Sequence, residues 1–237
     1  MPRFDMIAFD ADDTLWHNER LYVDAQAGFQ QLLAQYHSRE WIDSRLYETE
    51  MRNLEHFGYG IKAFALSMIE TAVGLTEGRI VGSDVQKIID LAREMLTAEV
   101  DLIDGVVDTL QTLSSRYALM VITKGDLRDQ ESKIVRSGLA DLFRHVEIVS
   151  DKTMAGYAAV LRRCSLDPAR FIMVGNSLKS DILPVLELGG HAVHIPHTLT
   201  WAHEVADAPT ADQTRFHALD SIVGLPGLLA QLDSEPV

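Results

Sequence analysis

The most constraining feature of the chain is residues 6–16, where an apolar run ends abruptly at carboxylates. The segment reads Met-Ile-Ala-Phe-Asp-Ala-Asp-Asp-Thr-Leu-Trp, so Asp10 and Asp12 follow the apolar residues and Thr14 comes two places later. A short apolar stretch followed by polar residues is typical of a buried parallel strand that delivers side chains to the edge of a sheet. Open α/β sheets bind ligands at that edge, so both carboxylates lie at a candidate site.

Neighbouring carboxylates at such an edge repel each other. For unit charges about 4 Å apart at an effective dielectric constant near 20, the repulsion is roughly 4 kcal/mol, so a cation or a shared proton must compensate. A hard divalent ion such as Mg²⁺, which takes oxygen ligands, is the simplest answer. A solvated acidic turn after the strand is the alternative explanation of Asp12 and Asp13 taken alone.

Composition limits the class of protein. The 237 residues suffice for one large domain or two modest ones with a substantial core. The single cysteine, Cys164, excludes an internal disulfide. The formal net charge of −14 repels nucleic acids and anionic membranes, so we expect neither as a partner. Without an apolar run of about 18 residues or a secretory signal pattern, the expectation is a cytoplasmic protein.

Helical periodicity without a convincing strand fills residues 17–100, and Ser83 with Gln86 three residues later predicts a capping-box start for one helix there. From Val106 onward strands and helices alternate, which indicates a parallel sheet covered on both faces. The predicted fold is therefore α/β, a Rossmann-like three-layer core of residues 1–16 and 101–237 with an inserted all-helical cap domain of residues 17–100. Besides residues 6–9, the candidate strands are 118–122, 146–149, 171–174 and 192–195, and the candidate core helices include 127–135, 154–164, 182–188 and 222–232.

Polar residues of useful types follow four of the five predicted strands. Because parallel strands share one carboxyl edge, these residues can converge although they are far apart in the sequence. The converging residues are Asp10, Asp12, Thr123, Lys152, Asn176 and Asp181.

This set, in this order, resembles the four motifs of the haloacid dehalogenase superfamily in its phosphatase form. The first motif matches Asp10-Ala11-Asp12-Asp13-Thr14, and the fourth matches the segment that begins Gly175-Asn176 and reaches Asp181. The resemblance implies a Mg²⁺-dependent phosphohydrolase of a small phosphorylated metabolite, with a helical cap inserted after the first strand.

The resemblance also implies a role for each residue. Asp10 is the nucleophile that forms an aspartyl-phosphate, and Asp12 is the general acid and base. Thr123 binds the phosphoryl group and Lys152 neutralises the nucleophile and the transferring group. Mg²⁺ is held by Asp10, the backbone carbonyl of Asp12, Asn176 and Asp181. Asn176 is a departure, since the fourth motif usually begins Gly-Asp, and Thr153 stands where the Lys is often followed by Pro.

Further residues are candidates for substrate binding. Lys124 at the sheet edge is a rival to Lys152, with a surface position as its alternative interpretation. Trp16 and His17 follow the nucleophile strand where the chain enters the cap, so we expect them to line the substrate cleft. The histidines of the last third of the chain fit no zinc signature, so no metal site is expected from their spacing; they are His191, His194, His197 and His203.

Three other functions remain open. A 2-haloacid dehalogenase uses an aspartate nucleophile without a metal, but relatives of that type lack the carboxylate that Asp12 supplies. A phospho-accepting receiver domain groups similar residues, but is about half this length and has no helical insertion. A binding protein that kept the fold without turnover fits the sequence as well. The oligomeric state stays open.

Overall fold

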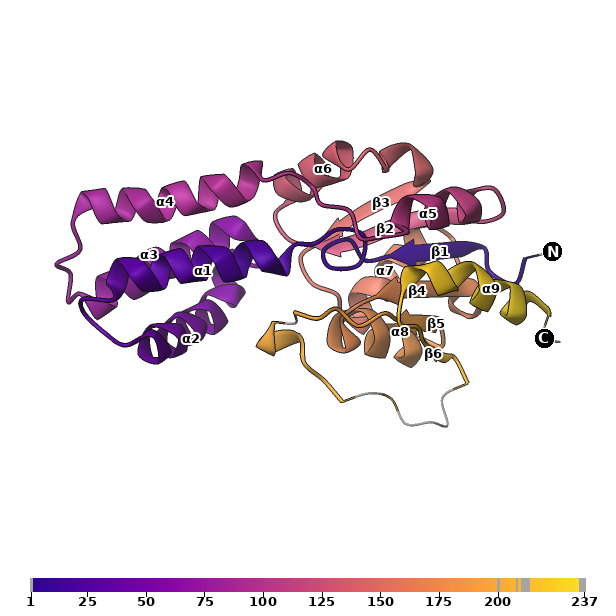
Figure 1. Cartoon of the computed structure of the whole chain (residues 1–237). Helices are drawn as coiled ribbons and strands as arrows, with labels where there is room; N and C mark the ends of the chain where they lie inside the picture. The colour runs from indigo at the N-terminus through magenta and orange to yellow at the C-terminus, as the bar shows by residue number, and fades with distance from the viewer. Residues whose placement is uncertain (1, 200, 208, 210–213, 235–237) are drawn as a thin grey trace. The chain divides into compact units, whose positions relative to one another are not determined.

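The computed structural model describes residues 2–199, 201–207, 209 and 214–234 (Figure 1). It divides into two compact units. The sheet unit comprises the described residues of Met1–Glu19, Val100–Lys124 and Glu131–Val237, and the helical unit comprises Arg20–Glu99 and Gly125–Gln130. The segment Gly125–Gln130 thus clusters with the helical unit, whereas the predicted boundaries assign it to the core.

Among the described residues, six strands form one sheet in the order β3-β2-β1-β4-β5-β6. Every neighbouring pair is parallel, which confirms the predicted α/β class. The predicted number of five strands is wrong, because the sixth strand has three residues at the sheet edge and is too short to show a periodic pattern. The strands are β1 (Met6–Phe9), β2 (Ala118–Lys124), β3 (His145–Val149), β4 (Phe171–Gly175), β5 (His191–His194) and β6 (Phe216–Ala218).

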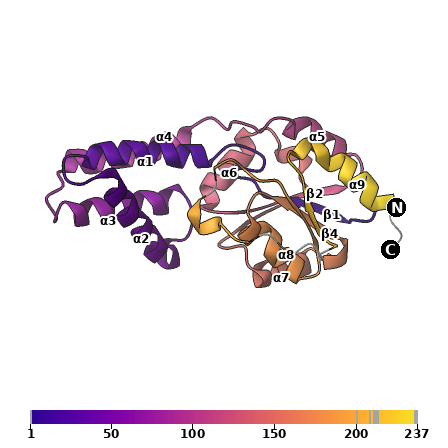
Figure 2. The same ribbon diagram turned by 60° about the horizontal axis from the view of Figure 1, so that its bottom comes forward.

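Strand β1 shows how the sheet is covered on both faces. Its four residues are buried, and successive side chains point to opposite faces. Ile7 and Phe9 pack in one apolar cluster with α5 and α9, whereas Met6 and Ala8 pack in a second with α7 and α8. Figure 2 shows these two helix pairs on opposite sides of the sheet, which gives the expected three layers. The helices are α5 (Val106–Ser114), α7 (Met154–Arg163), α8 (Leu183–Glu187) and α9 (Leu225–Ser234).

The helix after β4 differs from the sequence prediction. A π-helix, η3 (Leu178–Ile182), precedes α8, so the helical segment begins four residues before the predicted start at Ile182. Pro184 lacks a backbone N–H and favours the first turn of a new helix, which explains why α8 starts here. The remaining short or boundary elements are α6 (Leu127–Arg136), η1 (Ala140–Leu142), η2 (Pro168–Arg170), η4 (Ala202–Glu204) and η5 (Ile222–Gly224).

The helical unit is built on its own apolar core, which includes Phe29, Ile42 and Met68. The predicted capping box at Ser83 is wrong: the N-cap is Val81, two residues before Ser83, and its side chain makes no capping hydrogen bond. No helix in the described part of the chain is both long and apolar enough to cross a membrane. The helices of the unit are α1 (Glu19–Leu33), α2 (Arg39–Phe57), α3 (Ile61–Leu75) and α4 (Gly82–Thr97).

Candidate active site

The carboxyl ends of β1, β2 and β4 lie side by side, because β1 pairs with β2 on one side and with β4 on the other. The backbone N–H of Asp10 donates to the carbonyl of Val174 at 2.9 Å, which continues the pairing one residue beyond β1. Asp10, Thr123 and Asn176 therefore reach the same edge of the sheet, as the sequence predicts.

Lys152 joins two carboxylates at this edge. Its ammonium donates to Oδ1 of Asp10 and, at 2.7 Å, to Oδ1 of Asp181. The side chains of Lys152 and Asp181 are each 1% exposed, so the three groups form a buried charge cluster. Segments more than a hundred residues apart in the sequence thus supply one site, with Lys152 reaching it from the segment after β3.

Burial sets the protonation of this cluster. It raises the pKa of Asp10 to about 7, with Lys152 opposing the shift and the carboxylates of Asp181 and Asp12 adding to it. Burial alone would lower the pKa of Lys152, but the charges of Asp10 and Asp181 outweigh it and raise that pKa. Lys152 therefore stays charged, and further positive charge would be needed to keep Asp10 fully ionised near neutral pH.

An oxygen-rich donor set surrounds Asp10. The hydroxyl of Thr14 lies 3.1 Å from Oδ2 of Asp10, to which it donates, and 3.3 Å from Oδ1 of Asn176. The carboxylates of Asp10 and Asp181 and the amide oxygen of Asn176 are the hard ligands that Mg²⁺ prefers. The chemistry of these donors fits such an ion.

The loop after β4 holds Asp181 against the strand. Its Oδ2 accepts a 3.0 Å hydrogen bond from the backbone N–H of Ser177. The contact requires glycine at position 175, because a Cβ there would lie 2.3 Å from that oxygen. The Ser177 hydroxyl accepts from the backbone N–H of Ser180 at 3.0 Å and so fixes the start of η3. This local structure fixes the buried carboxylate of Asp181, which the sequence alone indicates only by its distance along the chain from the end of β4.

Asp12 is held by a lysine that the sequence analysis did not single out. The ammonium of Lys133, on α6, lies 2.9 and 3.0 Å from the two carboxylate oxygens of Asp12 and 3.0 Å from Oδ1 of Asn18. The indole of Trp16 donates to the same carboxylate at 2.7 Å. Lys133 is 6% exposed. A lysine in a polar helical stretch gives no sequence signal for such a position, since only packing reveals the buried face.

Lys124 and Lys152 occupy different surroundings. Thr123 is 1% exposed at the end of β2, and Lys124, the next residue, forms an ion pair with Glu204 and donates to Ser180 Oγ at 2.9 Å. The side chain of Lys124 is 16% exposed, so the surface interpretation of this residue is wrong. Burial would raise the pKa of Glu204, but Lys124 and hydrogen bonds from Ser177 and Ser180 lower it to about 2.

Trp16 and His17 lie in contrasting positions. Trp16 is 1% exposed in the core of the sheet unit, which leaves almost no surface for a ligand and corrects the expectation that it lines the cleft. Its contact with Asp12 instead fixes a carboxylate. His17 is exposed, and its Nδ1 lies 3.2 Å from Nε2 of His197. The binding roles of Thr123, Lys124 and His17 stay predictions.

Comparison with known proteins identifies the family. A model of the haloacid dehalogenase-like hydrolases matches residues 4–189. The chain is similar to the crystal structure of a haloacid dehalogenase-like family hydrolase from Xanthomonas campestris, with 40% identity and a TM-score of 0.88 over 98% of this chain and 93% of that one. No curated protein matches significantly.

Two more distant structures share the fold alone. One is a 2-haloacid dehalogenase from Pseudomonas syringae pv. Tomato, with 22% identity and a TM-score of 0.65 over 97% of this chain and 99% of that one. The other is a predicted phosphoglycolate phosphatase from Haemophilus somnus, with 17% identity and a TM-score of 0.64 over 96% and 99%. The fold is thus common to structures described as dehalogenases and as phosphatases. The buried Asp10–Lys152–Asp181 cluster, the family model and the Xanthomonas structure agree: the chain belongs to the haloacid dehalogenase-like hydrolases.

Proposed function

We propose that the protein is a Mg²⁺-dependent phosphohydrolase that acts on a small phosphorylated metabolite. The observation that carries the proposal is a second carboxylate, Asp12, two residues after Asp10 and 21% exposed at its side chain, beside the buried cluster of Asp10, Lys152 and Asp181. A metal-free dehalogenase needs one attacking carboxylate, whereas ester hydrolysis also needs a group that protonates the leaving oxygen.

The reaction proceeds in two steps through an aspartyl-phosphate on Asp10. A carboxylate oxygen of Asp10 attacks phosphorus, the bond from phosphorus to the ester oxygen breaks, and Asp12 gives that oxygen its proton. Water then attacks the phosphorus of the aspartyl-phosphate and gives a proton to Asp12. The bond from phosphorus to Asp10 breaks, which releases inorganic phosphate and restores the Asp10 carboxylate and the protonated Asp12 with which the cycle began.

The other residues hold and neutralise charge. Lys152 keeps the attacking oxygen of Asp10 in place and offsets charge on the transferring group. Lys133 and Trp16 orient Asp12, so Asp12 must give up part of its contact with Lys133 before it can carry a proton to a leaving group. Thr123 is the proposed phosphoryl-binding hydroxyl.

Mg²⁺ would be held by Asp10, Asp181, Asn176 and the backbone carbonyl of Asp12. When bound, the ion supplies positive charge to the phosphoryl oxygens. The raised pKa of Asp10 supports this role, because an added cation favours the ionised nucleophile.

The substrate class follows from charge and connectivity. A net charge of −14 disfavours nucleic acids as substrates. The helical unit is inserted in the chain directly after the carboxylate loop, between Glu19 and Val100, and we assign it the role of a cap that excludes water during turnover. A cap favours small soluble phosphate esters over proteins.

The test is phosphate release from a panel of metabolite phosphates with and without Mg²⁺. We expect Mg²⁺-dependent release that falls at least about 10³-fold in Asp10→Asn, which lacks the nucleophile. Asp12→Asn should bind Mg²⁺ and turn over slowly. Fluoride release from fluoroacetate, measured with chelator present, is the matched dehalogenase assay. Fluoride release without phosphate release would replace our proposal with a dehalogenase, and full kcat in Asp12→Asn would remove its acid–base role.

A further inference from the structure

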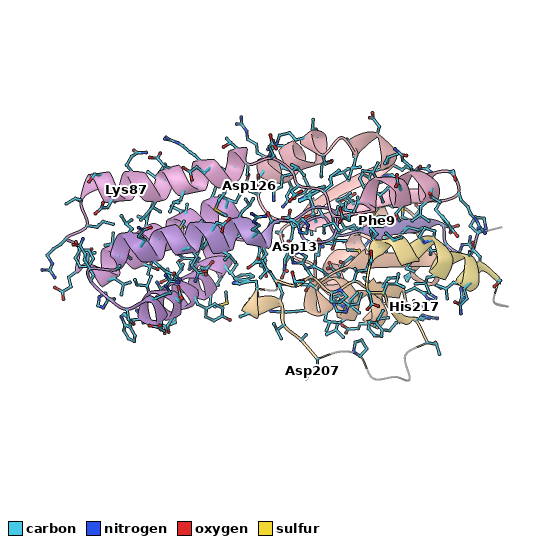
Figure 3. All side chains as sticks on the ribbon, in the orientation of Figure 1. Phe9, Asp13, Lys87, Asp126, Asp207 and His217 are labelled. Carbon is cyan, nitrogen blue, oxygen red and sulfur yellow. The ribbon has the colours of Figure 1, made fainter. Side chains whose placement is uncertain are left out.

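A second cluster of potential metal ligands lies in the sheet unit, and it includes none of the proposed Mg²⁺ ligands. Asp13, His17 and His197 each offer one ligand atom, and these atoms lie within 4.8 Å of one another. Asp13, which is labelled in Figure 3, belongs to the loop after β1, and His197 belongs to the segment after β5. The two histidines are 180 positions apart, which is why spacing in the sequence shows no zinc signature.

Two of the three separations between the ligand atoms are close to the spacing that a tetrahedral ion imposes. Nδ1 of His17 lies 3.2 Å from Nε2 of His197, and that Nε2 lies 3.6 Å from Oδ1 of Asp13. Ligands bound tetrahedrally at about 2.0–2.1 Å lie roughly 3.3 Å from one another. The ligand atoms of the third pair, Asp13 and His17, lie within 4.8 Å of each other, so side-chain adjustments would bring the three atoms around one ion.

The surroundings hold two of the ligands in place. Nδ1 of His197 lies 2.9 Å from the carbonyl oxygen of Leu199 and 3.3 Å from the backbone nitrogen of the same residue, and the shorter contact favours the tautomer with the proton on Nδ1. An N–H donated to a backbone carbonyl presents the other ring nitrogen, Nε2, as a ligand, and metal-binding histidines usually have such a partner. The Asp13 carboxylate accepts the backbone N–H of Asn18 at 2.8 Å and of Glu19 at 3.1 Å, so it is oriented before any ion arrives.

We propose that Asp13, His17 and His197 form a binding site for a borderline divalent ion such as Zn²⁺. Two imidazole nitrogens and one carboxylate suit Zn²⁺ and its neighbours in the transition series, whereas Mg²⁺ prefers oxygen ligands alone. The side chains of His197 and Asp13 are only 10% and 9% exposed, whereas His17 is exposed, so an ion here would be open to water on the His17 side and would tie the segment after β5 to the loop that follows the nucleophile. The proposed Zn²⁺ site is independent of whether the enzyme is a phosphohydrolase or a dehalogenase.

The experiment is a titration of the full chain, without a histidine tag, with Zn²⁺ against a chromophoric chelator in excess Mg²⁺. We expect one Zn²⁺ per chain, and Co²⁺ in its place should give visible absorption bands. His17→Ala and His197→Ala should each weaken Zn²⁺ binding at least tenfold, since loss of even an outer-shell partner costs about 10–100-fold. His56→Ala, which removes an exposed histidine of the helical unit, is the matched control and should bind as the parent does.

Asp181→Asn separates this proposal from the proposed function. It removes a Mg²⁺ ligand outside the cluster, so it should lower hydrolysis and keep the Zn²⁺ stoichiometry. Thermal unfolding of each variant without Zn²⁺ checks that the fold is intact. Absence of tight Zn²⁺ binding, or binding that both histidine substitutions leave unchanged, would overturn the proposed site. Loss of Zn²⁺ in Asp181→Asn would show that the ion binds among the catalytic carboxylates instead.

Discussion

Replacing Glu204 with Gln should destabilise the sheet unit near neutral pH and have a much smaller effect in acid. Glu204 pairs with Lys124, and its other oxygen accepts from Ser177 Oγ and Ser180 Oγ, each at 2.5 Å. The side chains of the pair are only 11% and 16% exposed. The substitution therefore leaves a largely buried ammonium without its counter-charge.

The pKa of Glu204 gives the magnitude. A fall from 4.5 to about 2 on folding corresponds to about 3.4 kcal/mol at about 1.36 kcal/mol per unit. Because the pair keeps some contact with solvent, the contribution is smaller, and we expect Glu204→Gln to lower the free energy of unfolding by about 2–3 kcal/mol. Because the folded pKa is the lower one, the stabilisation is fully present above about pH 4.5 and disappears as the pH falls through about 2. Near pH 3 less than half of it, about 1.4 kcal/mol at most, remains.

Urea unfolding of the parent and of Glu204→Gln near pH 7 and near pH 3 measures both values. At neutral pH the loss corresponds to a fall in Tm of about 5–10 °C. Glu131→Gln, an exposed change on α6, is the control and should stay within about 0.5 kcal/mol of the parent. A variant as stable as this control near pH 7, or an equal loss at both pH values, would refute the electrostatic argument.

Three further changes test the site. Lys152→Met leaves Asp10 and Asp181 buried without their shared ammonium, so urea unfolding near pH 7 should show a loss of about 3–5 kcal/mol, and a fully stable variant would contradict the buried pair. Gly175→Ala places a Cβ 2.3 Å from Oδ2 of Asp181, so hydrolysis should need at least about tenfold more Mg²⁺; an unchanged requirement would mean that Asp181 is not a ligand. Burial and the charges of Asp13, Asp12 and Glu204 raise the pKa of Glu19 from 4.5 to about 7, so the parent loses stability as the pH rises through this interval. Glu19→Gln should therefore be about 1–2 kcal/mol more stable than the parent near pH 8 and equal to it near pH 4, measured by unfolding at both pH values.

Local pattern predicted the elements that depend on burial alone. The sequence predicts β1 as a strand because its four residues are apolar and are followed by carboxylates. In the structure all four are buried. The same reasoning identified β2 to β5 within one or two residues at each end, and the parallel order made Asp10, Lys152 and Asp181 converge. It failed at β6 and at the start of α4, where a short edge strand and a cap depend on neighbours rather than on periodicity.

The sequence by itself determined the fold class, the family resemblance and the acidic residues at the sheet edge, because strand periodicity and residue type are local properties. Only the tertiary structure decided which groups surround them. Lys133 reaches Asp12 across 121 positions and Glu204 reaches Lys124 across 80, from the helix α6 and the short 3₁₀ helix η4, and no pattern in the sequence marks these two side chains. Their roles come from burial and charge pairing, which arise when distant segments pack together and leave no periodic trace in the chain.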